Sequence, residues 1–395
     1  MFVYLDNSAT TKQYDAVTDK MIEYMREDFG NPSSLHKLGL TAEKAVRAAR
    51  KNVAEALNAR EEEIIFTSGG TESDNTALLG AASARKRRGK KIITTAIEHP
   101  AILEAAGRLE NLGFTIEYIG VDEKGTVDME SFRQSITEDT ILISAMGVNN
   151  EVGTMEPIHE MVQIKNEYNK KHGTEVLFHT DAVQAFGKLP VQSSGIDMIS
   201  VSGHKIHGPK GIGALYIRKG LTIEPYLIGG GQEKHMRSGT ENVPAIAGFG
   251  QAAQTAGRNL ENRVRKMSAA RDYLLEGIQT EIKDIKINSA EKDSPIWEQG
   301  LCCPSVLNIS FLGTRGEVLL HTLEQADIYV STGSACSSNK KGQSHVLKAM
   351  GLKDKEIEGA IRFSFSEFNT TEEMDYVLEH LKQAVTKFRK LGSFR

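Results

Sequence analysis

Short apolar segments of strand length alternate with helix-like segments from about residue 41 to about residue 327, and this alternation restricts the possible folds more than any other feature. In the helix predicted over 41–58, Val46, Ala49 and Val53 recur with helical periodicity and make one face apolar. The short segments are rich in Ile, Leu and Val, which is typical of strands buried on both faces. Chains built in this way form an α/β fold around a largely parallel sheet. The predicted strands are 64–66, 92–94, 141–143, 176–178, 198–201 and 214–217.

A second folding unit is expected toward the carboxyl end of the chain. The chain has 395 residues, more than one hydrophobic core usually organises. Leu260 and Met267 belong to a long amphipathic pattern, after which strand and helix signals start again. We therefore expect a large domain over 14–260 and a smaller α+β domain that combines 1–13 with 261–395.

Charge, hydropathy and cysteine content exclude several classes of partner. The formal net charge of −4 provides no overall field for nucleic acid or anionic lipid, and the basic run 85–91 is interpreted as a solvated helix end rather than an RNA-binding patch. No apolar run reaches the roughly 18 residues of a membrane span, and Asp6 comes too early for a signal peptide. The 3 cysteines argue against a disulfide framework and for a reducing compartment, by default the cytoplasm. We expect no direct nucleic acid, no membrane and no metal among the partners.

A glycine turn follows the first predicted strand. Gly69, Gly70 and Thr71 come directly after apolar residues and before a probable helix. Glycines let the backbone approach an anion, and the amides of a first helical turn, with the Thr71 hydroxyl, can donate hydrogen bonds to phosphate. The same residues would also make an ordinary capping turn. The phosphate interpretation therefore needs support from elsewhere in the chain.

Two later strand ends provide that support. Asp181 lies at the end of one predicted strand, and Ser202, His204 and Lys205 follow the next. Ligands of open α/β sheets bind beyond the carboxyl ends of the strands. A lysine that forms a Schiff base, a carboxylate that keeps a ring nitrogen protonated and a phosphate loop are the parts of a pyridoxal-phosphate site. We therefore predict that the chain binds pyridoxal 5'-phosphate.

The remaining candidates are one histidine and the cysteines. Cys336 lies in a loop of small polar residues with lysines close by in sequence, a setting that favours a reactive thiolate. Cys302 and Cys303 are expected to be a half-buried structural pair. His99 follows another predicted strand and, by position alone, could be a histidine satisfied by its own backbone.

Taken together, the ordered motifs resemble the cysteine desulfurase family, in the class V aminotransferase-like branch of fold-type I pyridoxal-phosphate enzymes. The resemblance covers nearly the whole chain and implies that family's fold and homodimeric assembly. Besides the glycine turn and the strand-end motifs, the matching segments are 4–11, 29–32, 148–153, 236–240, 333–336 and 361–364.

The resemblance also implies a role for each site residue. Lys205 would carry the cofactor, and His99 would stack on its ring and assist proton transfer. Asp181 would pair with the ring nitrogen, and Arg362 would clamp the substrate carboxylate with its guanidinium fork. The ring hydroxyl side would be reached by Gln184 and Asn150, the latter also close to the substrate. The phosphate would be held by Gly70, Thr71, Ser202 and His204, joined by Thr240 of the partner subunit.

The implied reaction takes sulfur from L-cysteine, leaves a persulfide on Cys336 and releases L-alanine. The sulfur acceptor stays open between an iron-sulfur scaffold, a tRNA-thiolation enzyme and a cofactor pathway. The end of the sequence lacks the longer tail with which some family members dock the scaffold. Two alternatives are a selenocysteine lyase and a non-catalytic sulfur-carrier or assembly subunit. The loop cysteine argues against the lyase, and the presence of both Lys205 and Asp181 argues against the carrier.

Overall fold

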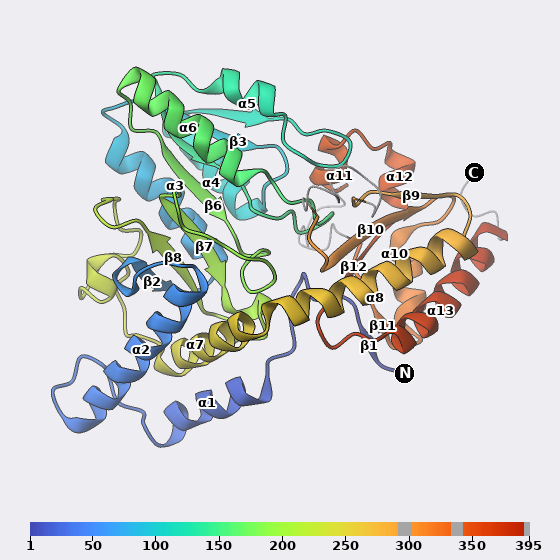
Figure 1. The fold of residues 1–395 in the computed structure, drawn as a ribbon, viewed down its shortest axis with the longest axis horizontal. Helices are drawn as coiled ribbons and strands as arrows, with labels where there is room; N and C mark the ends of the chain where they lie inside the picture. Colours follow the sequence, from blue (N-terminus) through green and yellow to red (C-terminus); the bar gives the residue numbers. More distant parts are fainter. Residues whose placement is uncertain (291–301, 333–342, 391–395) are drawn as a thin grey trace.

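The computed structural model describes residues 1–290, 302–332 and 343–390 and is organised around a sheet of 7 strands in the order β2-β8-β7-β6-β5-β3-β4 (Figure 1). Strands β7, β6, β5, β3 and β4 are mutually parallel, whereas β8 runs antiparallel to both of its neighbours. The α/β fold with a largely parallel sheet is therefore confirmed. The strands are β2 (Ile64–Thr67), β3 (Lys91–Thr95), β4 (Thr115–Ile119), β5 (Thr140–Ser144), β6 (Leu177–Asp181), β7 (Met198–Ser202) and β8 (Gly213–Ile217).

Helices cover both faces of this sheet, which explains why every residue of its central strands β5, β6 and β7 is buried. Ile143 and Phe178 point to one face, which packs against helices that include α2 and α7. Leu142 and Leu177 alternate with them and point to the other face, against α3 and α4. The helices of this part of the chain are α1 (Asp15–Arg26), α2 (Lys37–Ala56), α3 (Gly70–Arg85), α4 (Pro100–Asn111), α5 (Met129–Ser135), α6 (Ile158–His172) and α7 (Val243–Arg258), with the short 3-10 turns η1 (Glu61–Glu63), η2 (Gly203–Lys205) and η3 (Glu233–His235).

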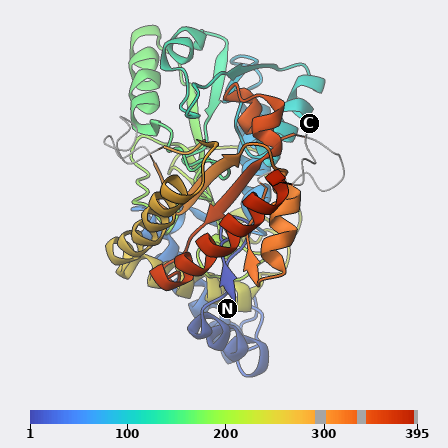
Figure 2. The ribbon, with the colours of Figure 1, turned by 90° about the vertical axis from the view of Figure 1, so that its right-hand side faces the viewer.

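The carboxyl-terminal elements enclose a separate hydrophobic core. An antiparallel sheet of 3 strands in the order β12-β10-β9 packs against the long helices α8 and α13. The chain start joins this core through Val3 and Leu5, and Figure 2 shows the first strand (blue) among the orange and red carboxyl-terminal elements. These elements are β1 (Val3–Tyr4), α8 (Leu260–Glu281), β9 (Ile285–Ile287), β10 (Val306–Phe311), α10 (Gly316–Glu324), β11 (Ile328–Tyr329), α11 (His345–Ala349), α12 (Asp354–Glu358), β12 (Ala360–Ser364) and α13 (Thr371–Lys390).

Three details differ from the sequence-based expectation. The helix predicted over 41–58 is α2, which begins earlier because the His36 ring caps it by accepting a hydrogen bond from Gly39 N at 3.3 Å. Strand β4 was not predicted, since it lies at the edge of the sheet and most of its side chains are partly or fully exposed. The expected half-buried cysteine pair is wrong in degree: Cys302 and Cys303 are both buried, and burial raises the pKa of the Cys302 thiol to about 11.

None of the helices in the described part of the chain is both long and apolar enough to cross a membrane.

Candidate active site

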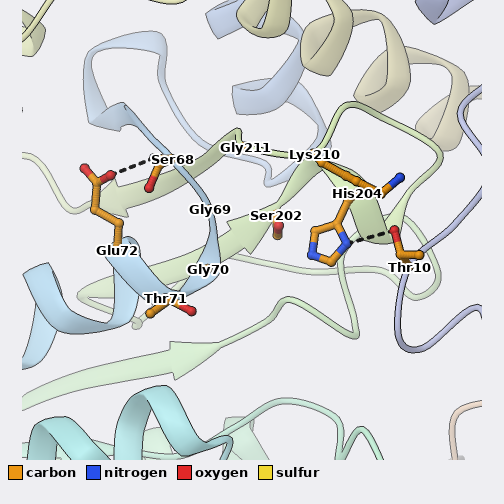
Figure 3. Close-up of a pocket in the computed structure, with 10 residues that line it drawn as sticks. All are labelled: Thr10, Ser68, Gly69, Gly70, Thr71, Glu72, Ser202, His204, Lys210 and Gly211. Atoms are coloured by element: carbon orange, nitrogen blue, oxygen red, sulfur yellow. Dashed lines mark hydrogen bonds between the residues drawn. The ribbon is translucent and has the colours of Figure 1, made fainter. Parts of the chain in front are cut away.

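A cavity of about 410 Å³ opens where the first turn of α3 meets the end of β7 (Figure 3). The cavity is rich in groups that can bind an anion: backbone amides, hydroxyls, an imidazole and the Lys210 ammonium. Apart from Thr240, which was predicted to come from the partner subunit, all of the predicted phosphate-binding residues line this cavity. They are Gly70, Thr71, Ser202 and His204. The complete lining is Thr10, Ser68, Gly69, Gly70, Thr71, Glu72, Ser202, His204, Lys210 and Gly211.

The glycine turn owes its shape to close backbone packing. Gly69 has a φ of +152°, a conformation that side chains disfavour. A Cβ on Gly213, at the start of β8, would lie 2.8 Å from the Gly69 Cα, so position 213 excludes larger residues by contact, whereas position 69 is restricted by its backbone conformation. Glu72 fixes the turn from the other side, because its carboxylate accepts hydrogen bonds from Ser68 N at 2.8 Å and from Arg237 Nε at 2.9 Å.

Lys205 lies in η2, directly after β7, and its amine is held by the amino-terminal segment. The Nζ donates hydrogen bonds to the carbonyl oxygens of Ser8 at 2.5 Å and Ala9 at 2.8 Å. Thr11 ties the same segment to η2, because its N and Oγ1 donate to His204 O at 3.0 and 2.9 Å. The amino-terminal segment therefore forms one wall around the candidate cofactor-binding lysine.

Asp181 and His99 approach the lysine from the ends of β6 and α4. Asp181 is buried, which raises its carboxyl pKa, although His99 and Lys205 oppose the shift. The His99 Nδ1 accepts a hydrogen bond from Ala101 N at 3.1 Å, so a neutral ring carries its proton on Nε2. Burial lowers the pKa of His99 and keeps it in that neutral form at neutral pH. Lys205 and His99 both act on the pKa of Asp181, and Lys205 and Asp181 both act on the pKa of His99, so the three groups belong to one site.

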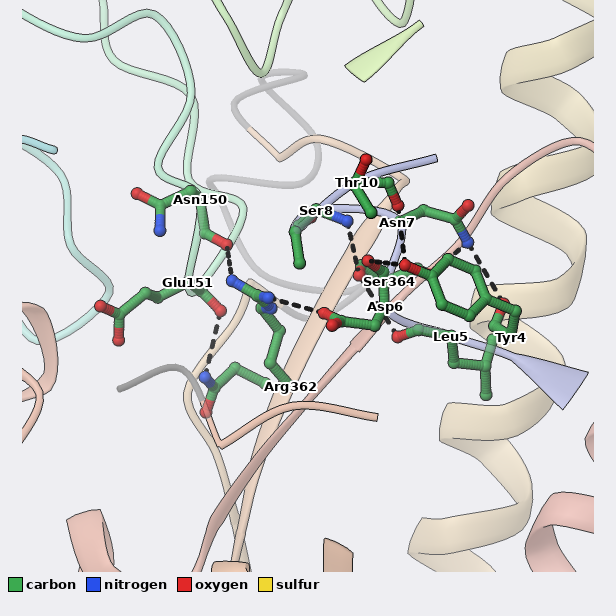
Figure 4. A network of polar contacts seen from close by, with 12 residues as sticks. Tyr4, Leu5, Asp6, Asn7, Ser8, Thr10, Asn150, Glu151, Arg362 and Ser364 are labelled. Carbon is green, nitrogen blue, oxygen red and sulfur yellow. Dashed lines mark hydrogen bonds and ion pairs between the residues drawn. The ribbon is translucent and has the colours of Figure 1, made fainter. Parts of the chain in front are cut away.

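Arg362 lies in β12 and reaches the same region from the carboxyl-terminal core. Its Nη2 donates to Asp6 Oδ1 at 2.8 Å and its Nη1 to Asn150 O at 3.0 Å, on two sides of the guanidinium (Figure 4). The side chain is buried, yet its Nε finds no hydrogen-bond partner among the described residues. An arginine fixed at two positions with a third donor left over is suited to bind an incoming carboxylate.

The remaining predicted residues divide into three groups. Gln184 lies beside Lys205, because its Nε2 donates to the same Ser8 carbonyl at 3.0 Å. Asn150 contributes its backbone oxygen to Arg362, while its side chain points away from that guanidinium. Thr240 is exposed and does not line the anion cavity of its own chain. Cys336 lies outside the described residues.

Sequence reasoning missed several residues that shape this site. Asp6 and Ser8 belong to a segment that was noted for its resemblance, but nothing in their order indicates contacts with Arg362 and Lys205. Glu98 was also missed: its buried carboxyl accepts from Thr95 Oγ1 at 2.7 Å and Met146 N at 2.9 Å. Burial raises the pKa of Glu98 to about 8, so it is neutral beside His99 under mildly acidic conditions. Only tertiary contacts reveal these roles.

The donor set fits pyridoxal phosphate. The cavity supplies donors and a cation for a phosphate, Lys205 supplies an amine for an aldehyde, and Asp181 supplies a buried carboxylate for a ring nitrogen. Among the described residues, no group of 3 or more His, Cys, Asp or Glu side chains is placed to hold a metal ion. The fold and the site together define a fold-type I pyridoxal-phosphate enzyme.

Comparison with known proteins identifies the family. The profile of the family "Aminotransferase class-V" matches residues 3–377. A protein named cysteine desulfurase IscS from Methanosarcina thermophila is 45% identical over 392 residues, which cover 99% of this chain and 93% of that protein. A solved structure of a NifS-like protein has a TM-score of 0.90 at 40% identity and covers 98% of this chain and all of its own. A solved structure of SspA in complex with cysteine has a TM-score of 0.79 at 31% identity, covering 93% of this chain and all of its own. The chain belongs to the cysteine desulfurase family of class-V aminotransferases.

Proposed function

We propose that the chain is a pyridoxal-phosphate-dependent cysteine desulfurase that converts L-cysteine to L-alanine and leaves the sulfur on Cys336. The observation that carries the proposal is the convergence of three groups from distant parts of the fold: the Lys205 amine held by Ser8 and Ala9, the buried Asp181 carboxylate and the Arg362 guanidinium. These are the amine, the acid and the carboxylate clamp that chemistry at the α-carbon of an amino acid needs.

The cofactor, when bound, supplies an electron-withdrawing ring that weakens bonds at the substrate α-carbon. Lys205 is proposed to hold it covalently, and Asp181 would keep a proton on its ring nitrogen. Gln184 and Asn150 are assigned to the ring hydroxyl side. The phosphate is proposed to bind Gly70, Thr71, Ser202 and His204, together with Thr240 of the partner subunit.

Substrate binding is assigned to Arg362. Its unpartnered Nε can donate to the cysteine carboxylate while Asp6 and the Asn150 carbonyl hold the guanidinium in place. The Lys205 amine then moves protons at the α-carbon. His99, neutral and protonated on Nε2, is the neighbouring group that assists this transfer.

Sulfur transfer is assigned to Cys336. Its thiolate attacks the substrate sulfur, so a sulfur–sulfur bond forms as the carbon–sulfur bond breaks. The substrate carbon takes up protons in place of sulfur, and the sum is cysteine plus an enzyme thiol giving alanine plus an enzyme persulfide. Small polar neighbours and Lys340 and Lys341 close by in sequence support a reactive thiol at this position.

The assembly and setting are proposed on separate grounds. Phe29, Leu35 and Ile228 are largely exposed in the single chain, as expected of residues that a second copy covers in a homodimer.

The low cysteine count supports the cytoplasm, where an iron-sulfur scaffold or a tRNA-thiolation enzyme would accept the sulfur. The separate hydrophobic cores support a division into residues 14–260 and residues 1–13 with 261–395.

The test is to treat the cofactor-loaded protein with L-cysteine, to quantify alanine and to map the persulfide by mass spectrometry. We expect one equivalent of alanine without a reductant, and an added sulfur on the peptide that contains Cys336. The variant Cys336→Ala should form neither from cysteine. Alanine formation that is unaffected by this substitution, or activity confined to selenocysteine, would contradict the proposal.

A further inference from the structure

A buried lysine lies behind the candidate cofactor site and has no role in the proposed reaction. Lys188 is only 3% exposed, and its Nζ donates to the side-chain oxygen of Gln184 at 2.8 Å. Gln184 is itself 5% exposed and lies one turn earlier in the segment that follows β6. Among the described residues, this amide oxygen is the hydrogen-bond acceptor that Lys188 contacts.

The surroundings of Lys188 make a purely structural role unfavourable. Burial lowers the pKa of Lys188 to about 8, and the cations of Arg263 and Arg362 act in the same direction, whereas the buried Cys303 thiol and Glu367 oppose the shift. The nearby Glu367 carboxylate is already paired with Arg263 at 2.9 Å and His207 at 3.3 Å. A buried amine without a carboxylate in contact costs stability, and such groups are found preferentially at functional sites.

A series of hydrogen bonds connects Lys188 with Lys205 through the Gln184 amide and the Ser8 carbonyl. Lysine can only donate, so the bond from Lys188 fixes the oxygen of the Gln184 amide and turns its nitrogen the opposite way. That nitrogen donates to the Ser8 carbonyl at 3.0 Å, and the same carbonyl accepts from Lys205 Nζ at 2.5 Å. The orientation of an amide is usually ambiguous, but here a charged donor determines it.

We propose that Lys188 is a positioning residue for the cofactor: it holds the Gln184 amide so that its N–H donors face the Ser8 carbonyl and the ring hydroxyl of the cofactor. The inference rests on the proposed function, which assigns Gln184 to that side of the ring. The charge behind the amide also polarises it and makes its N–H groups stronger donors.

The test uses Lys188→Met, which keeps the buried stem and removes the donor. The substitution removes the desolvation cost of a buried charge but leaves the Gln184 oxygen without its donor, which costs stability, so the cofactor is titrated well below the thermal midpoint of the variant. We expect the dissociation constant of pyridoxal phosphate to rise about three- to tenfold, the effect of weakening one hydrogen bond. Hydrogen bonds to the ring hydroxyl favour the proton-free state of the bound cofactor. Their weakening should therefore raise the pH midpoint of its visible absorbance change.

Lys165→Met is the matched control. Lys165 is also buried, but its Nζ contacts Gly195 O and Asp197 Oδ2, both at 3.4 Å, away from the cofactor site. We expect this variant to change the thermal midpoint of the cofactor-free protein and to leave the cofactor dissociation constant and the absorbance midpoint as in the wild type.

A double-mutant cycle tests whether Lys188 acts through Gln184. In a Gln184→Met background, Lys188→Met should cause no further change in either cofactor measurement. Wild-type values in the single variant, or effects of the two substitutions that simply add, would overturn the inference. Alanine formation by the wild type tests the proposed function separately, whereas the ratio of cofactor dissociation constants between variant and wild type tests the role of Lys188.

Discussion

Arg362→Lys tests how the substrate carboxylate is bound. The guanidinium donates to Asp6 and to the Asn150 carbonyl and has Nε left over, so three donors point in three directions from one rigid plane. A lysine keeps the charge but has a single nitrogen, which cannot hold both protein partners and the substrate at once. The variant should therefore lose at least one hydrogen bond between charged groups when cysteine binds.

Such a bond contributes about 1.5–3 kcal/mol, which corresponds to an increase of about 10- to 150-fold in KM for L-cysteine. Because the contact is present in both the bound substrate and the transition state, kcat should change far less. Steady-state kinetics with cofactor-saturated protein measures both. Arg263→Lys is the control, since Arg263 is another buried arginine but pairs with Glu367. An unchanged KM in Arg362→Lys, or an equal rise in the control, would refute the reasoning.

Further substitutions probe other parts of the account. Asp181→Asn should lower kcat about a hundredfold or more by leaving the ring nitrogen unprotonated, whereas cofactor content stays near normal; wild-type turnover would contradict the assignment. Cys336→Ser should keep the visible absorbance of the cofactor but form no alanine from cysteine, as a coupled alanine assay will show. Glu98 has its pKa raised from 4.5 to about 8, so the folded state retains a proton that the unfolded state loses, and stability declines as pH rises between these values. Glu98→Gln should remove up to about 1.4 kcal/mol per pH unit of this decline, measured by calorimetry of the cofactor-free protein. Glu233→Gln removes the negative charge and one of the two oxygens that the Arg50 Nη groups contact, at 2.7 and 2.8 Å, and should cost about 3–5 kcal/mol of stability because the Arg50 charge is left uncompensated; a thermal midpoint equal to that of the wild type would exclude a structural role.

The sequence predicted the parts of the fold that depend on local pattern. All six predicted strands correspond to strands of the large sheet, because strands buried on both faces leave short, mostly apolar segments. Strand ends also indicated Asp181 and Lys205, since ligands of such sheets bind at that edge. Strand β4 has no such apolar segment, because it lies at the edge of the sheet and its side chains are partly exposed to solvent.

Contacts across long sequence separations could not be predicted in this way. The Arg362 guanidinium meets Asp6 across 356 positions, and Gln184 meets Ser8 across 176. No periodicity or local motif encodes such pairs, because they depend on how the chain start packs against both cores. The same holds for the burial of Lys188 and Glu98, which look like ordinary surface residues in the sequence.

The central claim is that Lys205 binds the cofactor covalently. Borohydride reduction of the yellow, freshly prepared protein, followed by peptide mass mapping, tests it most directly. We expect the mass of a reduced pyridoxyl phosphate group on the peptide that contains Lys205 and on no other. An unmodified Lys205, or the added mass on a different lysine, would contradict the proposed chemistry.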